Sequence, residues 1–305
     1  MIARRHVPAS LFLAGLLLPI LVVATSSHLP AQDPNKAQLK NWHQWRGPDA
    51  SGVSRSANPP TEWSEDNNIQ WKVPVPGPGH SSPIVWQDRI YLTAAIPHGE
   101  PIDPPAGLRP GAHNNILKVR KTRFVVTALD RETGKTIWEK TVRNSLPHES
   151  RHDTGSYASA SPITDGERIY AFFGSNGLFA LDLKGNVLWE KDLGDMHVKH
   201  GHGEGASPVV HGETVVVNWD HEADSFIVAL AKRTGEELWR KPRDEVTSWA
   251  TPIVVTHDGQ AQVAGREDAQ RATDPEARHL PPALLLAQQD ARDQEPGEGE
   301  EQIDA

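Results

Sequence analysis

The 305-residue chain contains no cysteine, which removes several kinds of chemistry at once. Disulfides, thiolate zinc sites, cysteine nucleophiles and an acylated lipoprotein cysteine all need that side chain. Positive charge is not in surplus either, because 31 basic residues face 40 acidic ones and the formal net charge is −9. Phosphate binding needs clustered Lys and Arg. We therefore expect no nucleic-acid partner.

A long hydrophobic run is also lacking. The longest, from Leu11 to Ala24, has fourteen residues and is interrupted by Pro19, fewer than the roughly 20 needed to span a bilayer. Two arginines precede it and small residues follow it, which is typical of a secretory signal peptide. We predict a signal peptide at 1–31, export to the periplasm or the extracellular space, and no membrane span after cleavage; an uncleaved membrane anchor is the alternative.

Tryptophan, in contrast, is abundant, with ten Trp against three Tyr, and all ten lie between Trp42 and Trp249. Residues 264–305 contain no aromatic residue, and eleven acids face four arginines. Such a composition buries too little apolar surface to offset chain entropy. We predict a folded body at 41–263 and a disordered acidic tail at 264–305 with a short helix near 283–289. The abrupt change at 264 suggests a shifted reading frame or a truncated gene, with a natural tail as the alternative.

The body is built from an internal repeat. The segments ALDRETGKTIWEK, ALDLKGNVLWEK and ALAKRTGEELWRK occupy 128–140, 180–191 and 229–241, and their tryptophans are 51 and 50 residues apart. Each unit contains short β-rich runs separated by turn signals, and this period favours propeller blades. In the second unit, 168–174 and 177–183 are expected to form a hairpin joined by two residues, Ser175-Asn176.

The predicted fold is therefore all-β, an incomplete β-propeller of four-stranded blades. Three blades are full, a partial one lies around Trp63 to Val75, and another begins at Trp249. A ring that does not close leaves an open sheet edge that could pair with another chain.

The repeated motif has a structural interpretation, which is docking between blades. Asp130 is placed to accept backbone amides of a turn, Gly134 to supply a positive φ, and Trp138 to lay its ring against the neighbouring blade. A buried Trp removes about 150–250 Å² from water. The same roles fall to Asp182, Gly185 and Trp189 in the second copy and to Gly235 and Trp239 in the third.

At these residues the chain resembles the quinoprotein-type β-propellers, the pyrroloquinoline quinone (PQQ)-like repeat family. Ala128, Asp130, Thr133, Gly134 and Trp138 match the family's tryptophan-docking motif. The segment WHQWRGPDASG, which starts at residue 42, looks like the opening of secreted PQQ-like proteins of planctomycete-type bacteria. The resemblance implies either a quinone dehydrogenase or a non-enzymatic scaffold or binding protein such as the outer-membrane assembly factor.

The missing cysteine bears on that choice, because many dehydrogenases of the family carry a Cys-Cys pair over the quinone. They also hold calcium through Glu, Asn and Asp, a set that no motif places here. We predict a binding or scaffolding module without demonstrable catalysis, and we assign no catalytic residue. A PQQ-dependent dehydrogenase with calcium is the first alternative. A polysaccharide-binding protein using Trp42, Trp45 or Trp63 is the second. A protein or carbohydrate partner is left open.

Two loops that connect successive blades, 143–158 and 194–205, are rich in histidine and acids. Because the blades repeat, we expect these loops to lie side by side at one rim of the propeller. Imidazole and carboxylate groups suit Zn, Cu or Ni or acid–base chemistry, but a solvated loop is the simpler interpretation and no metal ligand is assigned. The candidate binding rim comprises His148, His152, Asp153, His197, His200, His202 and Glu204, with Glu149 beside them.

Three local expectations complete the prediction. In an extended run, His200, His202 and Glu204 would project to one side. The segment from Ile96 to Lys121 interrupts the first blade and is long enough to be a functional loop. The segment NWDHEADS at 218–225 is expected to be an exposed polar turn.

Overall fold

The computed structural model describes residues 38–54, 57–257, 260–265 and 284–285, all within one compact unit that spans Asp33–Ala305. The predicted signal peptide and nearly all of the predicted acidic tail lie outside the described residues. Among the described residues, no helix has the length and apolar character needed to cross a membrane.

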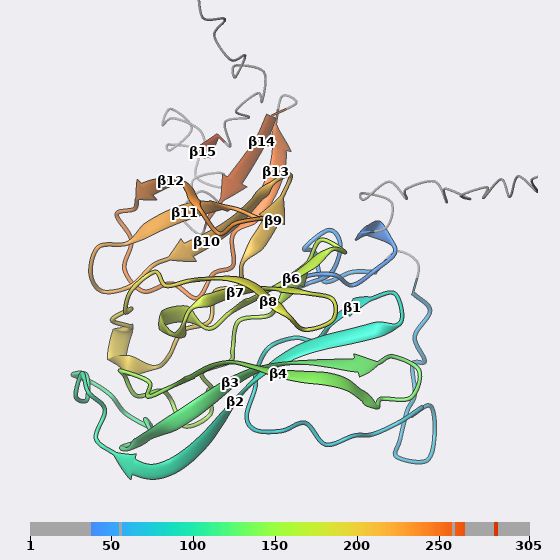
Figure 1. Ribbon diagram of the computed structural model, residues 1–305, viewed down its shortest axis with the longest axis horizontal. Coiled ribbons are helices and arrows are strands. Elements are labelled where there is room, and N and C mark those ends of the chain that lie inside the picture. The colour runs from blue at the N-terminus through green and yellow to red at the C-terminus, as the bar shows by residue number, and fades with distance from the viewer. Residues whose placement is uncertain (1–37, 55–56, 258–259, 266–283, 286–305) are drawn as a thin grey trace, which may run out of the picture. The chain divides into compact units, whose positions relative to one another are not determined.

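Four antiparallel sheets follow one another along the chain, and in each the strands pair in chain order. Three sheets have four strands, which confirms the three predicted blades (Figure 1). The first blade comprises β1 (Ile84–Trp86), β2 (Arg89–Ile102), β3 (Val119–Asp130) and β4 (Thr136–Ser145). The second comprises β5 (Ile163–Thr164), β6 (Arg168–Phe172), β7 (Leu178–Asp182) and β8 (Val187–Lys191). The third comprises β9 (Val209–His211), β10 (Thr214–Trp219), β11 (Phe226–Ala231) and β12 (Glu237–Pro242).

The fourth sheet has three strands in the described part of the chain: β13 (Ile253–His257), β14 (Gln260–Ala264) and β15 (Leu284–Leu285). Strand β15 pairs with β14, so the two described residues of the predicted helix at 283–289 form a strand instead. The first strands of the blades are neighbours, since β1 contacts β5, β5 contacts β9 and β9 contacts β13. This is the arrangement that consecutive propeller blades require.

The core lies between the blades. Successive residues of a strand point to opposite faces, and β7 buries both faces. Phe179 and Leu181 pack toward the first blade, while Leu178 and Ala180 pack toward the third. A smaller cluster joins the third blade to Val263 of the fourth. The sheets are thus held together by a series of interfaces between neighbours.

Tryptophan docking occurs as predicted for two of the three rings, Trp138 and Trp189. The Trp138 indole N–H donates to the Leu183 carbonyl at 3.1 Å, and a Cβ on Gly185 would lie 2.8 Å from the ring. Trp189 repeats this one blade further along, against Gly235. Trp138 and Trp189 therefore pack on the glycine turn of the next blade, where a side chain would collide. Trp239 packs against the cluster that joins the third blade to the fourth.

The chain leading into the first blade supplies one more docking residue, which the sequence analysis missed. Trp71 donates to the Arg131 carbonyl at 3.0 Å and lies over Gly134, whose φ is +71°. The partial blade predicted around Trp63 to Val75 is otherwise not formed, because its described residues contain only an isolated bridge between Ser64 and Asn67. Its docking tryptophan is present without its strands.

The predicted hairpin in the second blade also differs in detail. Its connection is not the pair Ser175-Asn176 but a 3-10 turn, Gly174–Asn176, flanked by Phe173 and Gly177. The wider turn matters for the rim, because the backbone amide of Ser175 donates to the side chain of Glu204 in the loop that follows the blade.

Candidate functional site

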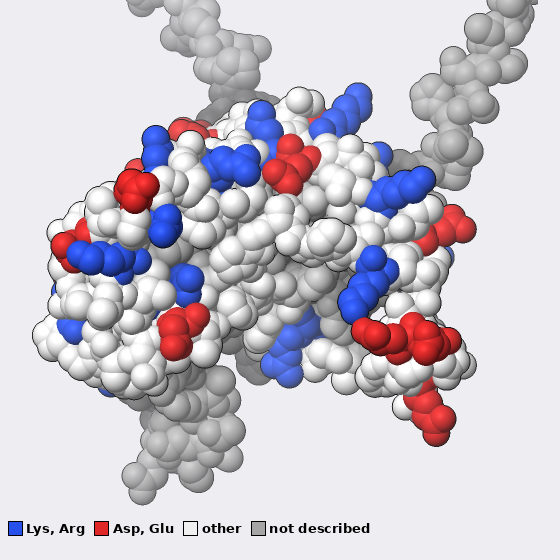
Figure 2. Space-filling view, turned by 90° about the horizontal axis from the view of Figure 1, so that it is seen from below, with Lys and Arg blue, Asp and Glu red and all other residues white. Residues whose placement is uncertain are grey.

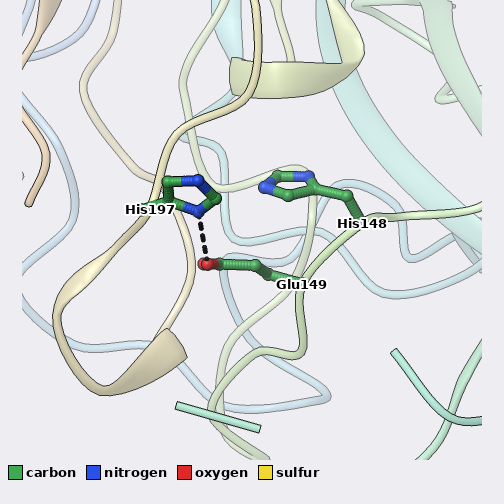
Figure 3. Close-up of side chains that lie close together, drawn as sticks. All are labelled: His148, Glu149 and His197. Atoms are coloured by element: carbon green, nitrogen blue, oxygen red, sulfur yellow. Dashed lines mark hydrogen bonds and ion pairs between the residues drawn. The ribbon is translucent and has the colours of Figure 1, made fainter. Parts of the chain in front are cut away.

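The two histidine-rich loops lie side by side, as the repeat geometry predicts. His148 donates from Nε2 to the Met196 carbonyl at 2.8 Å. His197 Nδ1 lies 3.0 Å from Glu149 Oε1 (Figure 3). Residues almost fifty positions apart are therefore in direct contact at one rim of the sheets.

Glu149 is the centre of these contacts, although its side chain is only 6% exposed. Its Oε1 also lies 2.8 Å from Nε of Arg109, which belongs to the insertion between β2 and β3. Its Oε2 accepts from the Val198 amide at 3.2 Å. One carboxylate thus joins the insertion to both rim loops, and we call this set the Glu149 latch.

The atoms of the latch also meet the distance requirement of a metal site. One ligand atom from each of His148, Glu149 and His197 lies within 4.8 Å of the others. The Arg109 guanidinium, however, contacts Glu149 Oε1, the oxygen that also faces His197. Like charges this close repel strongly in a buried setting. The geometry therefore supports a buried ion pair better than a bound cation.

Glu204 has a different environment from the one predicted. Its carboxylate accepts from the Ser175 amide at 2.7 Å and from the Ser175 hydroxyl at 2.5 Å. A Cβ on Gly174 would lie 1.4 Å from Glu204 Oε2, so only glycine leaves room for it. Burial raises the pKa of Glu204 to about 7, with a smaller raising effect from the Glu149 charge, against the lowering effect of the Ser175 hydrogen bonds and of His148.

The expectation that His200, His202 and Glu204 share one side is therefore wrong. The chain between them is not extended, because Lys199–Gly201 form a 3-10 turn in which His200 has a φ of +57°. That turn keeps the two histidines together, with ring centres 5.4 Å apart. Glu204 instead contacts the 3-10 turn of the second blade.

His202 contacts three other histidine rings, from His113, His152 and His200. Burial, and then the charges of those three neighbours, lower the pKa of His202. Asp153, the remaining predicted rim residue, is exposed and lies 3.2 Å from His152 Nδ1. His113 was missed by the sequence analysis, because an insertion has no fixed place in a repeat and only its histidine content hinted at a role.

Between the loops lies a pocket lined by Glu149, Glu204, Asn218, Asp220 and Trp249 among others. The expectation of an exposed turn at 218–225 is confirmed only for its tip, residues 222–224, which is exposed. Asn218, Asp220 and His221 are buried, and Asp220 is paired with Arg243 at 2.8 Å. The polar residues continue directly from the buried end of β10, which explains why they enter the interior.

The lining of this pocket does not fit PQQ, which is an acidic molecule with three carboxyl groups. Glu149, Glu204 and Asp220 contribute carboxyl groups, and no Lys or Arg is among the described residues that line it. The nearby cations Arg109 and Arg243 are already paired with Glu149 and Asp220. Without the calcium ion that the family's dehydrogenases use, further anionic groups here would add repulsion.

Comparison with known proteins establishes the family. The family model described as "Outer membrane protein assembly factor BamB" matches two overlapping stretches, 54–197 and 98–267. These stretches cover all three full blades and the docking motifs. The chain belongs to this family of PQQ-like repeat proteins.

Individual relatives are distant, and the match spans only part of each. A 1-butanol dehydrogenase (quinone) from Thauera butanivorans is 29% identical over 153 residues, which is 44% of this chain but 22% of that protein. A quinohemoprotein alcohol dehydrogenase from Pseudomonas putida is 20% identical, with a TM-score of 0.40, over 68% of this chain and 27% of the other. BamB from Moraxella catarrhalis is 22% identical, with a TM-score of 0.34, over 48% and 43%. The chain therefore spans less than half the length of each of these proteins.

Proposed function

We propose that this protein is an exported PQQ-like repeat protein that acts as a binding or scaffolding module without catalysis of its own. The observation that carries the proposal is the Glu149 latch. Glu149, one of the rim carboxylates that could act as an acid or base, is held by a guanidinium, an imidazole and a backbone amide at once. A group held in this way positions loops and is not free to exchange protons with a substrate.

Two other rim acids also hold loops through hydrogen bonds or ion pairs. Glu204 is held by Ser175, and Asp220 is held by Arg243 and Asn218. A rim whose acids hold its own loops is preorganised, which favours the binding of a partner because little ordering entropy is lost. In the face drawn in Figure 2, basic and acidic side chains are interspersed and form no patch of one sign.

A binding role at the rim is tested by photo-crosslinking in the native cell envelope. A crosslinking amino acid at Asp195, which is 63% exposed beside His148, should give a discrete adduct with one partner. The control places the same amino acid at Glu190, which is 57% exposed on the outer strand β8. Identical adduct patterns from the two positions, or none from Asp195, would contradict a partner at the rim.

Export is part of the proposal, and the basic and apolar segment before residue 32 supports it. N-terminal sequencing of the protein from fractionated cells tests this directly. We expect it outside the cytoplasm, beginning after residue 31. A cytoplasmic protein with an intact Met1 would contradict export.

The alternative activity is that of a quinone-dependent dehydrogenase, because one relative is named a 1-butanol dehydrogenase (quinone). Incubation of the purified chain with PQQ, Ca²⁺ and 1-butanol in a dye-reduction assay separates the two functions. We expect no dye reduction above that of boiled protein. Reduction that needs PQQ, calcium and the alcohol together would replace the binding function with catalysis.

The polysaccharide-binding alternative depends on exposed tryptophan. Trp42 packs against Gly47 and accepts from the Val85 amide through its carbonyl, which is a structural role. Trp45 is partly covered, with Arg46 5.3 Å from its ring centre. Trp63 is 68% exposed, so Trp63→Ala on a glycan array is the variant that tests this alternative.

A further inference from the structure

Four imidazole rings from three separate segments meet at the rim: His113 of the insertion, His152 of the first rim loop, and His200 and His202 of the second. The ring centre of His202 lies 5.0 Å from that of His113, 5.1 Å from His152 and 5.4 Å from His200. We propose that this four-histidine cluster binds a divalent transition-metal ion such as Zn²⁺ and thereby fixes the insertion to the rim loops.

The outer rings are prepared to act as ligands through their Nε2 atoms. His113 Nδ1 lies 2.8 Å from the Gly111 carbonyl and His200 Nδ1 lies 3.1 Å from the Pro110 carbonyl. Because a carbonyl oxygen only accepts hydrogen bonds, each Nδ1 carries the proton and each Nε2 keeps its lone pair. Histidines that bind metals are usually held in this way, with the second nitrogen donating to a carbonyl.

The spacing of three of the rings suits an ion at their centre. The ring centres of His113, His200 and His202 form a triangle with sides of 5.0, 5.4 and 5.9 Å. The point equidistant from them is about 3.2 Å from each, a distance that a metal–nitrogen bond of about 2.1 Å spans once a ring nitrogen turns toward it. As the rings stand, their nitrogens are not among the described groups whose ligand atoms lie within 4.8 Å of one another. His152 lies beside His202, with ring centres 5.1 Å apart, and its Nδ1 is already bonded to Thr154, so it borders the site.

His202 has an unsatisfied atom of its own. Its Nε2 is buried and has no hydrogen-bond partner in the described part of the structure. A buried polar atom without a partner lowers stability, so such atoms usually mark a missing ligand or water. A metal ion would satisfy this nitrogen, which the surrounding imidazoles do not.

The backbone at His200 is consistent with a site held under strain. His200 has a φ of +57°, a region that residues other than glycine seldom adopt and that is enriched at ligand sites. The ring fits only because residue 111 is glycine, since a Cβ there would lie 2.6 Å from His200 Nδ1. The insertion and the second rim loop are therefore matched to one another at this position.

The alternative metal site is the set of His148, Glu149 and His197, whose ligand atoms already lie within 4.8 Å of one another. Arg109 occupies that set, as described above, whereas the four-histidine cluster has no cation paired with it among the described contacts. The rings of the cluster meet edge to face, at 87° and 78° around His202. Binding therefore includes a rotation of His202 toward the Nε2 atoms of His113 and His200, whose Nδ1 contacts hold the two outer rings in place.

Calorimetric titration with Zn²⁺ tests the assignment on the whole chain, purified without a histidine tag and freed of metal with EDTA. We expect binding at the cluster to weaken at least tenfold in His202→Ala and in His113→Ala. His113 is exposed, so its replacement leaves the fold intact even if His202→Ala does not. His211→Ala, at an exposed histidine outside the cluster, and His197→Ala, in the latch, should bind like the unaltered protein.

Two results would overturn the proposal. Unchanged isotherms in both cluster variants would show that Zn²⁺ does not bind there. A loss confined to His197→Ala would place the ion in the latch. A second readout is hydrogen exchange of residues 104–117, which Zn²⁺ should slow several-fold in the unaltered protein and not in His113→Ala; equal slowing in both would contradict the role of the ion in fixing the insertion.

Discussion

Single glycines decide where the tryptophans dock. At Gly185 a Cβ would lie 2.8 Å from the Trp138 ring, and φ is +89°; at Gly212 φ is +54° but nothing lies within 4 Å. Gly212→Ala adds only backbone strain, about 1 kcal/mol, whereas Gly185→Ala adds a clash as well and should cost about 2–4 kcal/mol. Urea unfolding of both variants measures the difference. Equal losses of unfolding free energy in the two variants would show that the Trp138 ring does not need the space that a Cβ at Gly185 would fill.

A second prediction at this scale concerns pH. The pKa of Glu204 rises from its ordinary value of 4.5 to about 7 on burial, so the folded protein holds a proton that the unfolded chain has released. The contribution of the Glu204 proton to the free energy of unfolding is fully present below pH 4.5. It falls as the pH rises and is fully lost above about pH 7. The slope reaches at most about 1.4 kcal/mol per pH unit.

Glu204→Gln keeps an acceptor for the Ser175 amide but cannot titrate. Its unfolding free energy should therefore fall less than that of the unaltered protein between pH 5 and 7.5, measured by urea unfolding with EDTA present. Asp195→Asn, at an exposed carboxyl of the same loop, is the control and should follow the unaltered protein. Parallel pH profiles for Glu204→Gln and the unaltered protein would contradict the assignment.

At the residue scale, the sequence predicted which side chains form the docking contacts and the rim better than it predicted where each rim side chain lies. The docking roles of Asp130, Gly134 and Trp138 were predictable because a short motif with a fixed turn geometry determines them locally. Glu204 was misplaced because a 3-10 turn at 199–201 replaced the extended run. Asp220 was misjudged because its partner, Arg243, lies on the far side of a hairpin and no local pattern reveals it.

At the scale of elements, the docking tryptophans make contacts between neighbouring blades. The Trp189 ring packs on Gly235, and its N–H donates to the Lys232 carbonyl at 3.0 Å. Trp189→Leu should cost about 2–4 kcal/mol in unfolding free energy, because it removes both the ring and the hydrogen bond. Trp63→Leu, at a ring that is 68% exposed, should change it by less than about 0.5 kcal/mol. Similar losses in the two variants would contradict a docking role for Trp189.

The insertion between β2 and β3 offers a matched test of the latch. It contains one buried ion pair, Arg109–Glu149, and one exposed pair, Lys118–Asp103 at 2.7 Å. Breaking a buried pair leaves an uncompensated charge, while exposed pairs contribute little. Arg109→Gln should therefore speed hydrogen exchange in residues 104–117 about tenfold or more, and Lys118→Gln less than about threefold. Equal effects would show that the latch does not hold the insertion.

Strand order and blade number followed from the repeat, since each unit carries its own turn signals. What the repeat did not specify were the elements outside it. The insertion joins the rim through contacts to residues far along the chain, and Trp71 docks without the strands of a blade around it. Both depend on tertiary contacts, which spacing within a repeat does not encode.

For the folded part as a whole, the important feature is that each blade packs on its neighbours in series. In such arrays stability is close to a sum of unit and interface terms. The Trp138–Gly185 contact belongs to the interface of the first two blades, and Gly235 belongs to the next interface. Substitutions in different interfaces should therefore act independently, while those within one interface should not.

A double-mutant cycle tests this. Trp138→Leu removes the ring that a Cβ at Gly185 would meet. The double variant Trp138→Leu with Gly185→Ala should therefore lose about 1–3 kcal/mol less unfolding free energy than the sum of the losses in the two single variants. Trp138→Leu combined with Gly235→Ala should be additive within about 0.5 kcal/mol. Urea unfolding followed by both circular dichroism and tryptophan fluorescence supplies the free energies. Strong coupling between Trp138 and Gly235 would mean that the blades share one cooperative core, whereas additivity would show that each interface between neighbouring blades contributes to stability on its own.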